Sequence, residues 1–165
     1  MTSGALIDLA VGCIPLASGL ITAAIVGGVR GSAGEALAAR PPPVVFSIVW
    51  PLLYVAIGIS WVLSADADRP SRLATDVIYS AVAALLCVWI VVYSANTPEA
   101  RIRGVWVMVA SIAAVQAAWS VAARRSTWAA CLLSPLSAWL LFALMLSFAE
   151  VQDDARPQAR GAPRG

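Results

Sequence analysis

The sequence predicts an all-α membrane protein, a single bundle of five transmembrane helices. Of its 165 residues, 61% are hydrophobic and 12% are charged, and the mean hydropathy is +0.83. A water-soluble domain carries about a quarter charged residues, so most of this surface must face lipid. The charged residues also divide the chain into five long uncharged segments. These segments are continuously apolar, which disfavours the alternating strands of a transmembrane β-barrel.

Each uncharged segment is long enough to cross a bilayer. A charge at mid-membrane costs about 2.5–3.5 kcal/mol on insertion scales, so charged residues mark the ends of the spans. The gaps between them hold 20–25 residues, and about 20 suffice to cross the hydrocarbon core. In chain order, the predicted helices cover about 9–29, 43–65, 77–96, 104–123 and 127–149.

The first two helices have distinctive beginnings. No basic residue precedes Asp8, and the apolar run that follows exceeds that of a signal peptide, so we expect this segment to remain as a helix. The second helix begins after Arg40 with three prolines (41–43), which a first helical turn tolerates because its N–H groups have no intrahelical partner. The preceding loop, 30–40, is a candidate lid over the bundle.

The last three helices lie between successive groups of charges, and short loops separate them. Beyond them, residues 152–165 are rich in Arg, Pro, Gly and Asp. This composition predicts a disordered tail and leaves residues 1–151 as one domain. The third helix lies between Asp76 and Glu99, the fourth between Arg103 and Arg124, and the fifth between Arg125 and Glu150.

The arginines predict an orientation. The side of the bundle that holds the tail carries seven arginines and the other side four. The positive-inside rule therefore places the C-terminus in the cytoplasm, although the difference of three charges lies entirely in the tail. Arginine as the only basic residue type, with abundant alanine, suggests a GC-rich bacterial genome and hence a multi-pass protein of the bacterial cell membrane.

The composition also excludes several chemistries. The chain has no histidine and no lysine, so His-based triads, HExxH zinc sites and lysine Schiff bases are excluded. Its three cysteines each lie in an apolar run and indicate neither a disulfide framework nor a metal cluster. We expect a protein that is not an enzyme, requires no cofactor and no metal, and binds no nucleic acid.

Aromatic residues indicate a binding surface. Trp50, Tyr54 and Trp61 share one face of the second helix, and Gly58 would open a gap in that face. Pairs at helical spacing also occur in the third helix, at Trp89 and Tyr93, and in the fifth. We assign Trp50, Trp89 and Trp139 to a cavity for a planar apolar ligand. An interfacial belt is the interpretation for Trp61, Trp106 and Trp128.

Small residues indicate how the helices pack. Two ridges repeat every four residues, and in lipid such ridges allow helices to approach closely. We favour packing within the chain, with a homodimer as the alternative. Gln116 is interpreted as one interhelical hydrogen bond rather than a ligand contact. The ridges are Gly19, Ala23, Gly27 and Gly31 in the first helix and Ala110, Ala114, Ala118 and Ala122 in the fourth.

The second helix carries a run of residues that resembles a known signature. Pro41-Pro42, Val45-Phe46, Val49-Trp50, Tyr54 and Gly58 resemble the PP-x-x-V-F-x-x-V-W-x-x-x-Y-x-x-x-G pattern of the translocator protein family, also called tryptophan-rich sensory proteins. Weaker similarities lie in three other helices. They are Pro15 and Gly19, Trp89, and the run Pro135, Trp139, Phe142 and Leu146.

The resemblance implies five helices around a site for a tetrapyrrole such as protoporphyrin IX, or for a sterol or drug, roofed by the first loop. Together with the aromatic faces, it selects six candidate ligand-binding residues. It also implies a regulatory or transport role in tetrapyrrole or lipid handling or in stress responses. The alternatives are a small permease and a regulatory subunit without a ligand. The candidate residues are Trp50, Tyr54, Trp89, Trp139, Phe142 and Leu146.

The sequence departs from the family pattern at several positions, and it has fewer polar residues there than the family has. Ala39 and Arg40 stand where the family has a tryptophan and a threonine or histidine, so we do not expect the light-dependent porphyrin breakdown proposed for some members. The sterol motif of the fifth helix is missing at 148–150. Three further polar or tyrosine positions are occupied here by Leu86, Leu136 and Ser147.

Overall fold

Five helices make up the fold, and they confirm the predicted all-α membrane architecture. The computed structural model describes residues 3–27, 41–65 and 69–160, and no strand occurs among them. Each helix contains a segment long and apolar enough to cross a membrane. The helices are α1 (Ser3–Ile25), α2 (Pro43–Ser64), α3 (Arg69–Ser94), α4 (Pro98–Arg125) and α5 (Thr127–Arg160).

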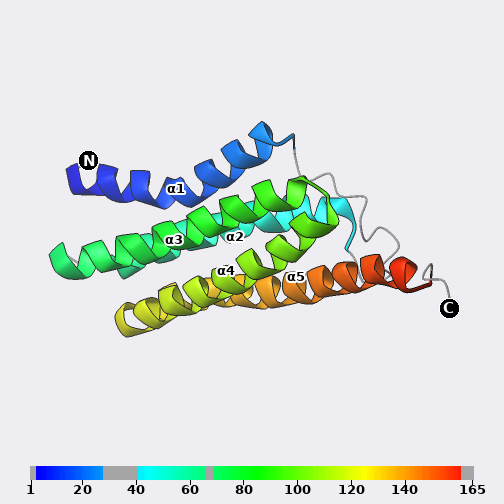
Figure 1. The fold of residues 1–165 in the computed structure, drawn as a ribbon. Coiled ribbons are helices and arrows are strands. Elements are labelled where there is room, and N and C mark those ends of the chain that lie inside the picture. Colours follow the sequence, from blue (N-terminus) through cyan, green and yellow to red (C-terminus); the bar gives the residue numbers. More distant parts are fainter. Residues whose placement is uncertain (1–2, 28–40, 66–68, 161–165) are drawn as a thin grey trace.

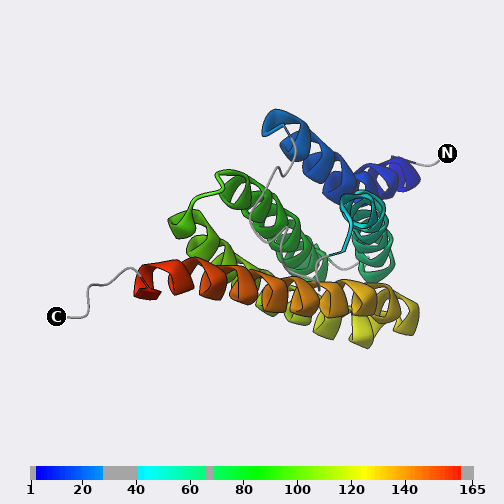
Figure 2. The same cartoon turned by 90° about the vertical axis from the view of Figure 1, so that its right-hand side faces the viewer.

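The central helix is α2. Within the described part of the chain it contacts all four other helices, whereas α1 contacts only α2 and α3. In Figure 2, α2 lies between α1 on one side and α5 on the other. The outermost helix is α1, and Pro15 and Gly19 are the only buried residues among 4–25. It bends midway along its length (Figure 1), as helices do at an internal proline, and Pro15 is that proline.

Successive helices run in opposite directions, so the chain junctions gather at two ends (Figure 1). The amino-terminal end holds the start of α1 and the α2–α3 and α4–α5 junctions. The carboxy-terminal end holds the end of α1, the start of α2, the α3–α4 junction and the end of α5. The predicted orientation compared the arginines at these two ends, and the helices do alternate in direction as that comparison assumes.

The helices extend beyond the predicted spans because a charge marks the edge of the hydrocarbon and does not end a helix. For example, α4 begins at Pro98 and not near 104. Thr97 is its N-cap, and the Thr97 hydroxyl accepts a hydrogen bond of 3.2 Å from the backbone N–H of Ala100. Glu99 in the first turn and Arg125 in the last complement the helix dipole.

The largest difference concerns α5, which continues to Arg160 instead of ending near 149. Residues 152–160, which the composition placed in a disordered tail, continue α5. Ala149, Glu150, Val151 and Gln152 are all compatible with a helix, and the first glycine in this region is Gly161. Residues 161–165 lie outside the described part.

The first helix ends earlier than predicted, at Ile25 and not at 29. Gly27 has a left-handed backbone conformation, with φ 72°, and its N–H donates to the carbonyl of Ala24. A glycine of this kind commonly ends a helix, so Gly27 is not a ridge residue. Gly31, and the loop 30–40 interpreted as a lid, lie outside the described residues.

A close contact between two glycines joins α1 to α2. A Cβ built on Gly58 would lie 1.9 Å from the carbonyl oxygen of Gly12. The two backbones therefore meet at a point where Gly58 cannot carry a side chain, whereas a Cβ on Gly12 would lie 3.2 Å from Cγ2 of Val62. The gap predicted in this face at Gly58 is occupied at its base by the backbone of α1.

In α4 the alanine ridge packs within the chain over its second half. Ala118 and Ala122 are fully buried, whereas Ala110 is exposed. The Gln116 amide donates to the hydroxyl of Ser137 in α5, over 3.3 Å. The interhelical hydrogen bond of Gln116 is confirmed, and packing within the chain is confirmed for the second half of the α4 ridge.

Hydroxyl groups link three helices near the amino-terminal end. The hydroxyl of Tyr79 in α3 lies 2.7 Å from that of Ser60 and 3.0 Å from that of Ser64, both in α2. Ser60 donates to the carbonyl oxygen of Ala129 in α5. All three hydroxyl-bearing residues are buried, so these bonds have no competition from water.

Tyr79→Phe is expected to lower the free energy of unfolding by about 1–2 kcal/mol. The substitution keeps the ring and leaves two buried serine hydroxyls without their shared partner. Thermal unfolding in detergent, followed by circular dichroism, measures the change. Ser134→Ala is the control, because the Ser134 hydroxyl bonds only within its own helix, to the carbonyl of Ala130. Equal losses for both variants would contradict a role for the interhelical bonds.

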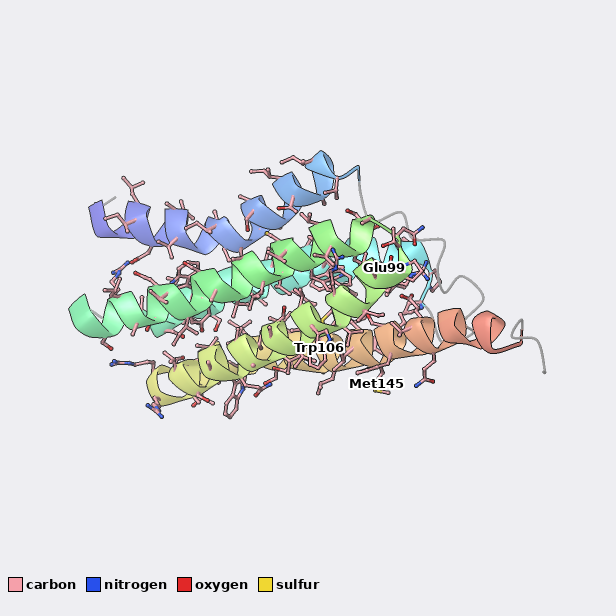
Figure 3. All side chains as sticks on the ribbon, in the orientation of Figure 1. Glu99, Trp106 and Met145 are labelled. Atoms are coloured by element: carbon pink, nitrogen blue, oxygen red, sulfur yellow. The ribbon has the colours of Figure 1, made fainter. Side chains whose placement is uncertain are left out.

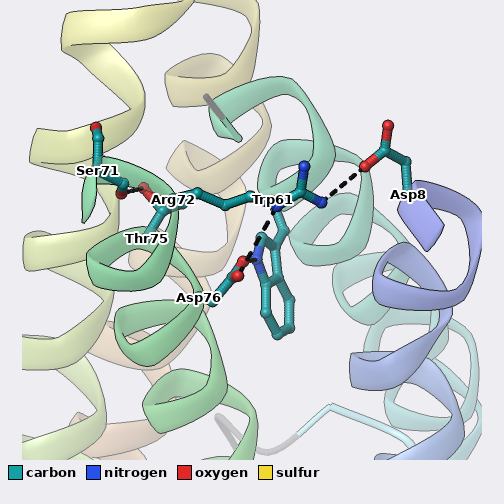
Figure 4. A network of polar contacts seen from close by, with 6 residues as sticks. All are labelled: Asp8, Trp61, Ser71, Arg72, Thr75 and Asp76. Atoms are coloured by element: carbon teal, nitrogen blue, oxygen red, sulfur yellow. Dashed lines mark hydrogen bonds and ion pairs between the residues drawn. The ribbon is translucent and has the colours of Figure 1, made fainter. Parts of the chain in front are cut away.

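Trp61 belongs to a polar cluster at the same end and not to an interfacial belt (Figure 4). Its side chain is only 2% exposed and stacks on Tyr79, with ring centroids 5.6 Å apart. Its indole N–H donates to the carboxylate of Asp76 over 2.8 Å. The belt prediction for Trp61 is therefore wrong. An indole near the end of a span can satisfy its N–H inside the bundle as well as at the interface.

The belt prediction fits the other two tryptophans better. Trp106 is 69% exposed and Trp128 is 78% exposed. Figure 3 shows Trp106 and Met145 on the outside of α4 and α5. Such large apolar side chains on the surface are expected where lipid is the solvent.

Candidate ligand-binding site

Three helices bring aromatic rings together in the half of the bundle nearer the carboxy-terminal end. The rings come from the first half of α2, the second half of α3 and the part of α5 just before its midpoint. Trp50 in α2 stacks on Trp89 in α3, with centroids 5.7 Å apart and planes at 30°. Trp89 stacks in turn on Tyr93, at 4.9 Å and 20°. Trp50 also contacts Tyr54, one turn further along α2.

A second ring group joins α2 to α5. Phe46 lies edge-on to Trp139, with centroids 5.6 Å apart and planes at 69°. Trp139 contacts Phe142 at the same centroid distance. Phe46 and Trp50 are one helical turn apart, so α2 connects this group to the first. Trp50, Trp139 and Phe142 are each half-buried.

Buried hydrogen-bond donors without partners are the chemical signature of this region. Within the described part of the chain, no partner exists for the hydroxyl of Tyr54 or for the indole nitrogens of Trp89 and Trp139. Tyr54 is 4% exposed and Trp89 7% exposed. Leaving a buried donor unsatisfied costs about 1–3 kcal/mol, so each such group requires an explanation. An acceptor supplied by a ligand or by ordered water would provide one.

Glycines allow close packing around two of these donors. A Cβ built on Gly19 in α1 would lie 2.6 Å from the ring of Tyr54. One built on Gly104 in α4 would lie 3.9 Å from the indole nitrogen of Trp89. The Tyr54 ring is thus held against α1, and the Trp89 N–H faces the α4 backbone.

A buried carboxylate closes the site on the carboxy-terminal side. The hydroxyl of Tyr93 donates to Oε2 of Glu150 over 2.6 Å, and both residues are buried. The bond connects α3 to α5 beyond the stacked rings. The bond is short and both of its partners are buried, so it links the two helices directly.

Five of the six candidate residues are members of the two ring groups. They are Trp50, Tyr54 and Trp89 in the first and Trp139 and Phe142 in the second. Leu146 is half-buried one turn beyond Phe142. The sequence analysis did not select Phe46, Gly104 or Glu150. Phe46 lies in the signature run, and Glu150 follows Leu146 by one helical turn, so spacing could have indicated both.

The positions where the sequence departs from the family pattern are filled by packing. Leu86 and Leu136 are fully buried, and the hydroxyl of Ser147 bonds within its own helix, to the carbonyl of Ala143. None of the three directs a polar group into the site. The described residues include no group of three or more His, Cys, Asp or Glu side chains that could hold a metal.

The fold and these groups define a class: a five-helix integral membrane protein with an internal aromatic cluster. The chain matches the model of the TspO/MBR family over residues 9–151. It therefore belongs to that family, and its general character is that of a ligand-binding or transport protein of the membrane. No curated protein and no solved structure matches it.

Proposed function

We propose that the chain binds a flat hydrophobic ligand, a tetrapyrrole first and a sterol second, among the rings of α2, α3 and α5. The residues proposed to hold it are Trp50, Tyr54, Trp89, Trp139, Phe142 and Leu146. The observation that carries the proposal is the set of buried donors without partners on Tyr54, Trp89 and Trp139. These donors belong to rings that contact other rings, so the preferred ligand combines an aromatic face with hydrogen-bond acceptors.

A tetrapyrrole has both features, since its macrocycle is planar and its carboxylate groups are acceptors. A sterol offers one hydroxyl group and a flat hydrocarbon face, which would satisfy fewer of the three donors. A planar ligand that enters between Trp50 and Trp89 has to separate two rings now in contact. The α2–α3 boundary is therefore where binding should change the fluorescence of the protein.

In this proposal the protein holds its ligand without covalent chemistry and takes part in regulation or transport. Its proposed setting is the bacterial cell membrane, with the C-terminus in the cytoplasm. The ion pair of Asp8 and Arg72 lies near the amino-terminal ends of α1 and α3 and not among the rings of the proposed site. Flux of protoporphyrin IX into liposomes containing the protein would distinguish a permease from a binder.

Trp50→Ala is expected to weaken the binding of protoporphyrin IX at least tenfold. The substitution removes one of the two rings on which the macrocycle would stack, and aromatic pairs contribute about 0.5–1.5 kcal/mol beyond the area they bury. Titration of protoporphyrin IX into purified protein, followed by its visible absorbance, measures the dissociation constant. Trp106→Ala is the matched control, because Trp106 lies on the outside of α4.

Trp139→Phe tests the donor directly. The substitution retains a ring and removes the N–H, so a several-fold loss of affinity would support a bond from Trp139 to the ligand. Both site variants must keep the helical content of the natural protein by circular dichroism. The proposal fails if protoporphyrin IX and cholesterol show no saturable binding, or if the site variants bind as the Trp106 variant does.

A further inference from the structure

A second concave surface lies away from the aromatic cluster, on the outer face of α1 and α2. It is a groove of about 540 Å³ between residues 5–16 of α1 and residues 55–63 of α2. Gly12 and Gly58 form its floor, where the two backbones touch. Leu9 and Ile59 are wall residues, and both are more than 40% exposed. None of the candidate aromatic residues lines it.

The groove opens towards the membrane. Its lining residues all belong to α1 and α2, so no other described helix borders this face of the pair. The lining is apolar except for Asp8, which lies near the amino-terminal end of α1. An apolar groove at this position is in contact with lipid acyl chains along its length.

The length of the groove corresponds to one leaflet. Residues 5–16 of α1 span about 16 Å at 1.5 Å per residue, and half of the hydrocarbon core is about 15 Å thick. The groove therefore extends from the headgroup layer on the amino-terminal side to about the middle of the membrane. A single acyl chain of that leaflet has the length and the polarity to fill it.

Charged groups at the surface end indicate which headgroup would fit. Asp8 Oδ1 lies 2.9 Å from Nη2 of Arg72 in α3, and Arg72 Nε lies 4.0 Å from Oδ2 of Asp76 (Figure 4). The side chains of Asp8 and Arg72 are 40% and 33% exposed. A carboxylate that lines the groove, beside a partly exposed guanidinium, complements a headgroup carrying an ammonium and a phosphate.

We propose that the groove binds one acyl chain of a phospholipid with a primary amine headgroup, from the leaflet on the amino-terminal side. The ammonium donates to Asp8, and a phosphate oxygen accepts from Arg72. A quaternary ammonium cannot donate. An anionic headgroup without an amine brings a further negative charge to Asp8, whose cationic partner Arg72 is already shared with Asp76. The lipid completes the packing of α1, the least buried helix. This inference is independent of the proposed tetrapyrrole site.

Two cysteines of the chain provide the test. Cys13 lines the groove and is exposed, and Cys131 is exposed on α5, which does not contact α1. The rate of N-ethylmaleimide modification of each is measured by mass spectrometry in detergent, with dioleoylphosphatidylethanolamine added. At a lipid concentration about ten times its Kd, mass action predicts about tenfold slower modification of Cys13. Cys131 should react at an unchanged rate.

Dioleoylphosphatidylcholine and dioleoylphosphatidylglycerol are the comparison lipids, and each is expected to slow Cys13 less than twofold at the same concentration. Equal protection by all three lipids would overturn the headgroup assignment. No protection by any of them, or equal protection of Cys131, would overturn the site. Protection that rises with protein concentration instead of lipid would assign this face to a contact between two copies of the chain.

Native mass spectrometry of the natural protein and two variants adds an independent measurement. Ile59→Trp fills the groove and should abolish retention of the phosphatidylethanolamine. Leu141→Trp, at a similarly exposed position on α5, should retain it. Asp8→Asn should lose the preference over phosphatidylglycerol. Retention of the lipid by the Ile59 variant would contradict the proposal.

Discussion

Gly58→Ala is expected to separate α1 from α2 and to lower the free energy of unfolding by about 1–3 kcal/mol or more. The added methyl carbon would lie 1.9 Å from the carbonyl oxygen of Gly12. That neighbour is backbone and cannot rotate away, so the helices must move apart. Thermal unfolding in detergent, followed by circular dichroism, measures the loss.

Gly104→Ala is the matched control. Gly104 is also buried in a helix, but a Cβ there would lie 3.8 Å from the ring of Tyr93, which is an ordinary van der Waals distance. Because alanine is favoured over glycine in helices by about 1 kcal/mol, this variant should be as stable as the natural protein or slightly more stable. Equal destabilisation of the two variants would contradict a specific contact between α1 and α2.

Trp61→Ala is expected to cost about 3–5 kcal/mol, the range for large aromatic residues removed from a core. The substitution leaves a cavity beside Tyr79 and deprives the carboxylate of Asp76 of its indole donor. Trp128→Ala, at an exposed position, should change the free energy of unfolding by less than about 0.5 kcal/mol. Chemical denaturation in mixed micelles measures both.

Trp61→Phe separates the two contributions of this residue. It retains a ring that can stack on Tyr79 and removes only the N–H that bonds to Asp76. We expect a loss intermediate between those of the other two variants. If Trp61→Ala and Trp128→Ala destabilise the protein equally, Trp61 is an interfacial residue and the assignment to the core is wrong.

The site was only partly predictable, for a reason specific to helices in lipid. Spacing placed Trp89 and Tyr93 on one face of a helix, and the two rings do stack. Spacing could not show that Phe46 would meet Trp139, since that contact depends on how α2 and α5 cross. The three donors without partners could not be recognised at all, because partners are defined only once neighbouring helices are in place.

Gly58 and Trp61 also show that the sequence does not reveal which face of a membrane helix is buried. In a water-soluble helix, polar residues mark the outer face. In a membrane helix both faces are apolar, so an aromatic face and a lipid-facing surface have the same composition. Trp61 near the end of a span was therefore read as interfacial, although Asp76 on the next helix supplies its partner inside the bundle.

By itself, the sequence determined the five spans, their order and their alternating direction, because the cost of a charge in hydrocarbon acts on each segment separately. Only the tertiary structure decided which faces meet. It brought Gly12 against Gly58, placed Trp61 in the core and left Trp106 on the surface. Helix association in lipid depends on close packing and interhelical hydrogen bonds rather than hydrophobicity, and these are properties of pairs of helices.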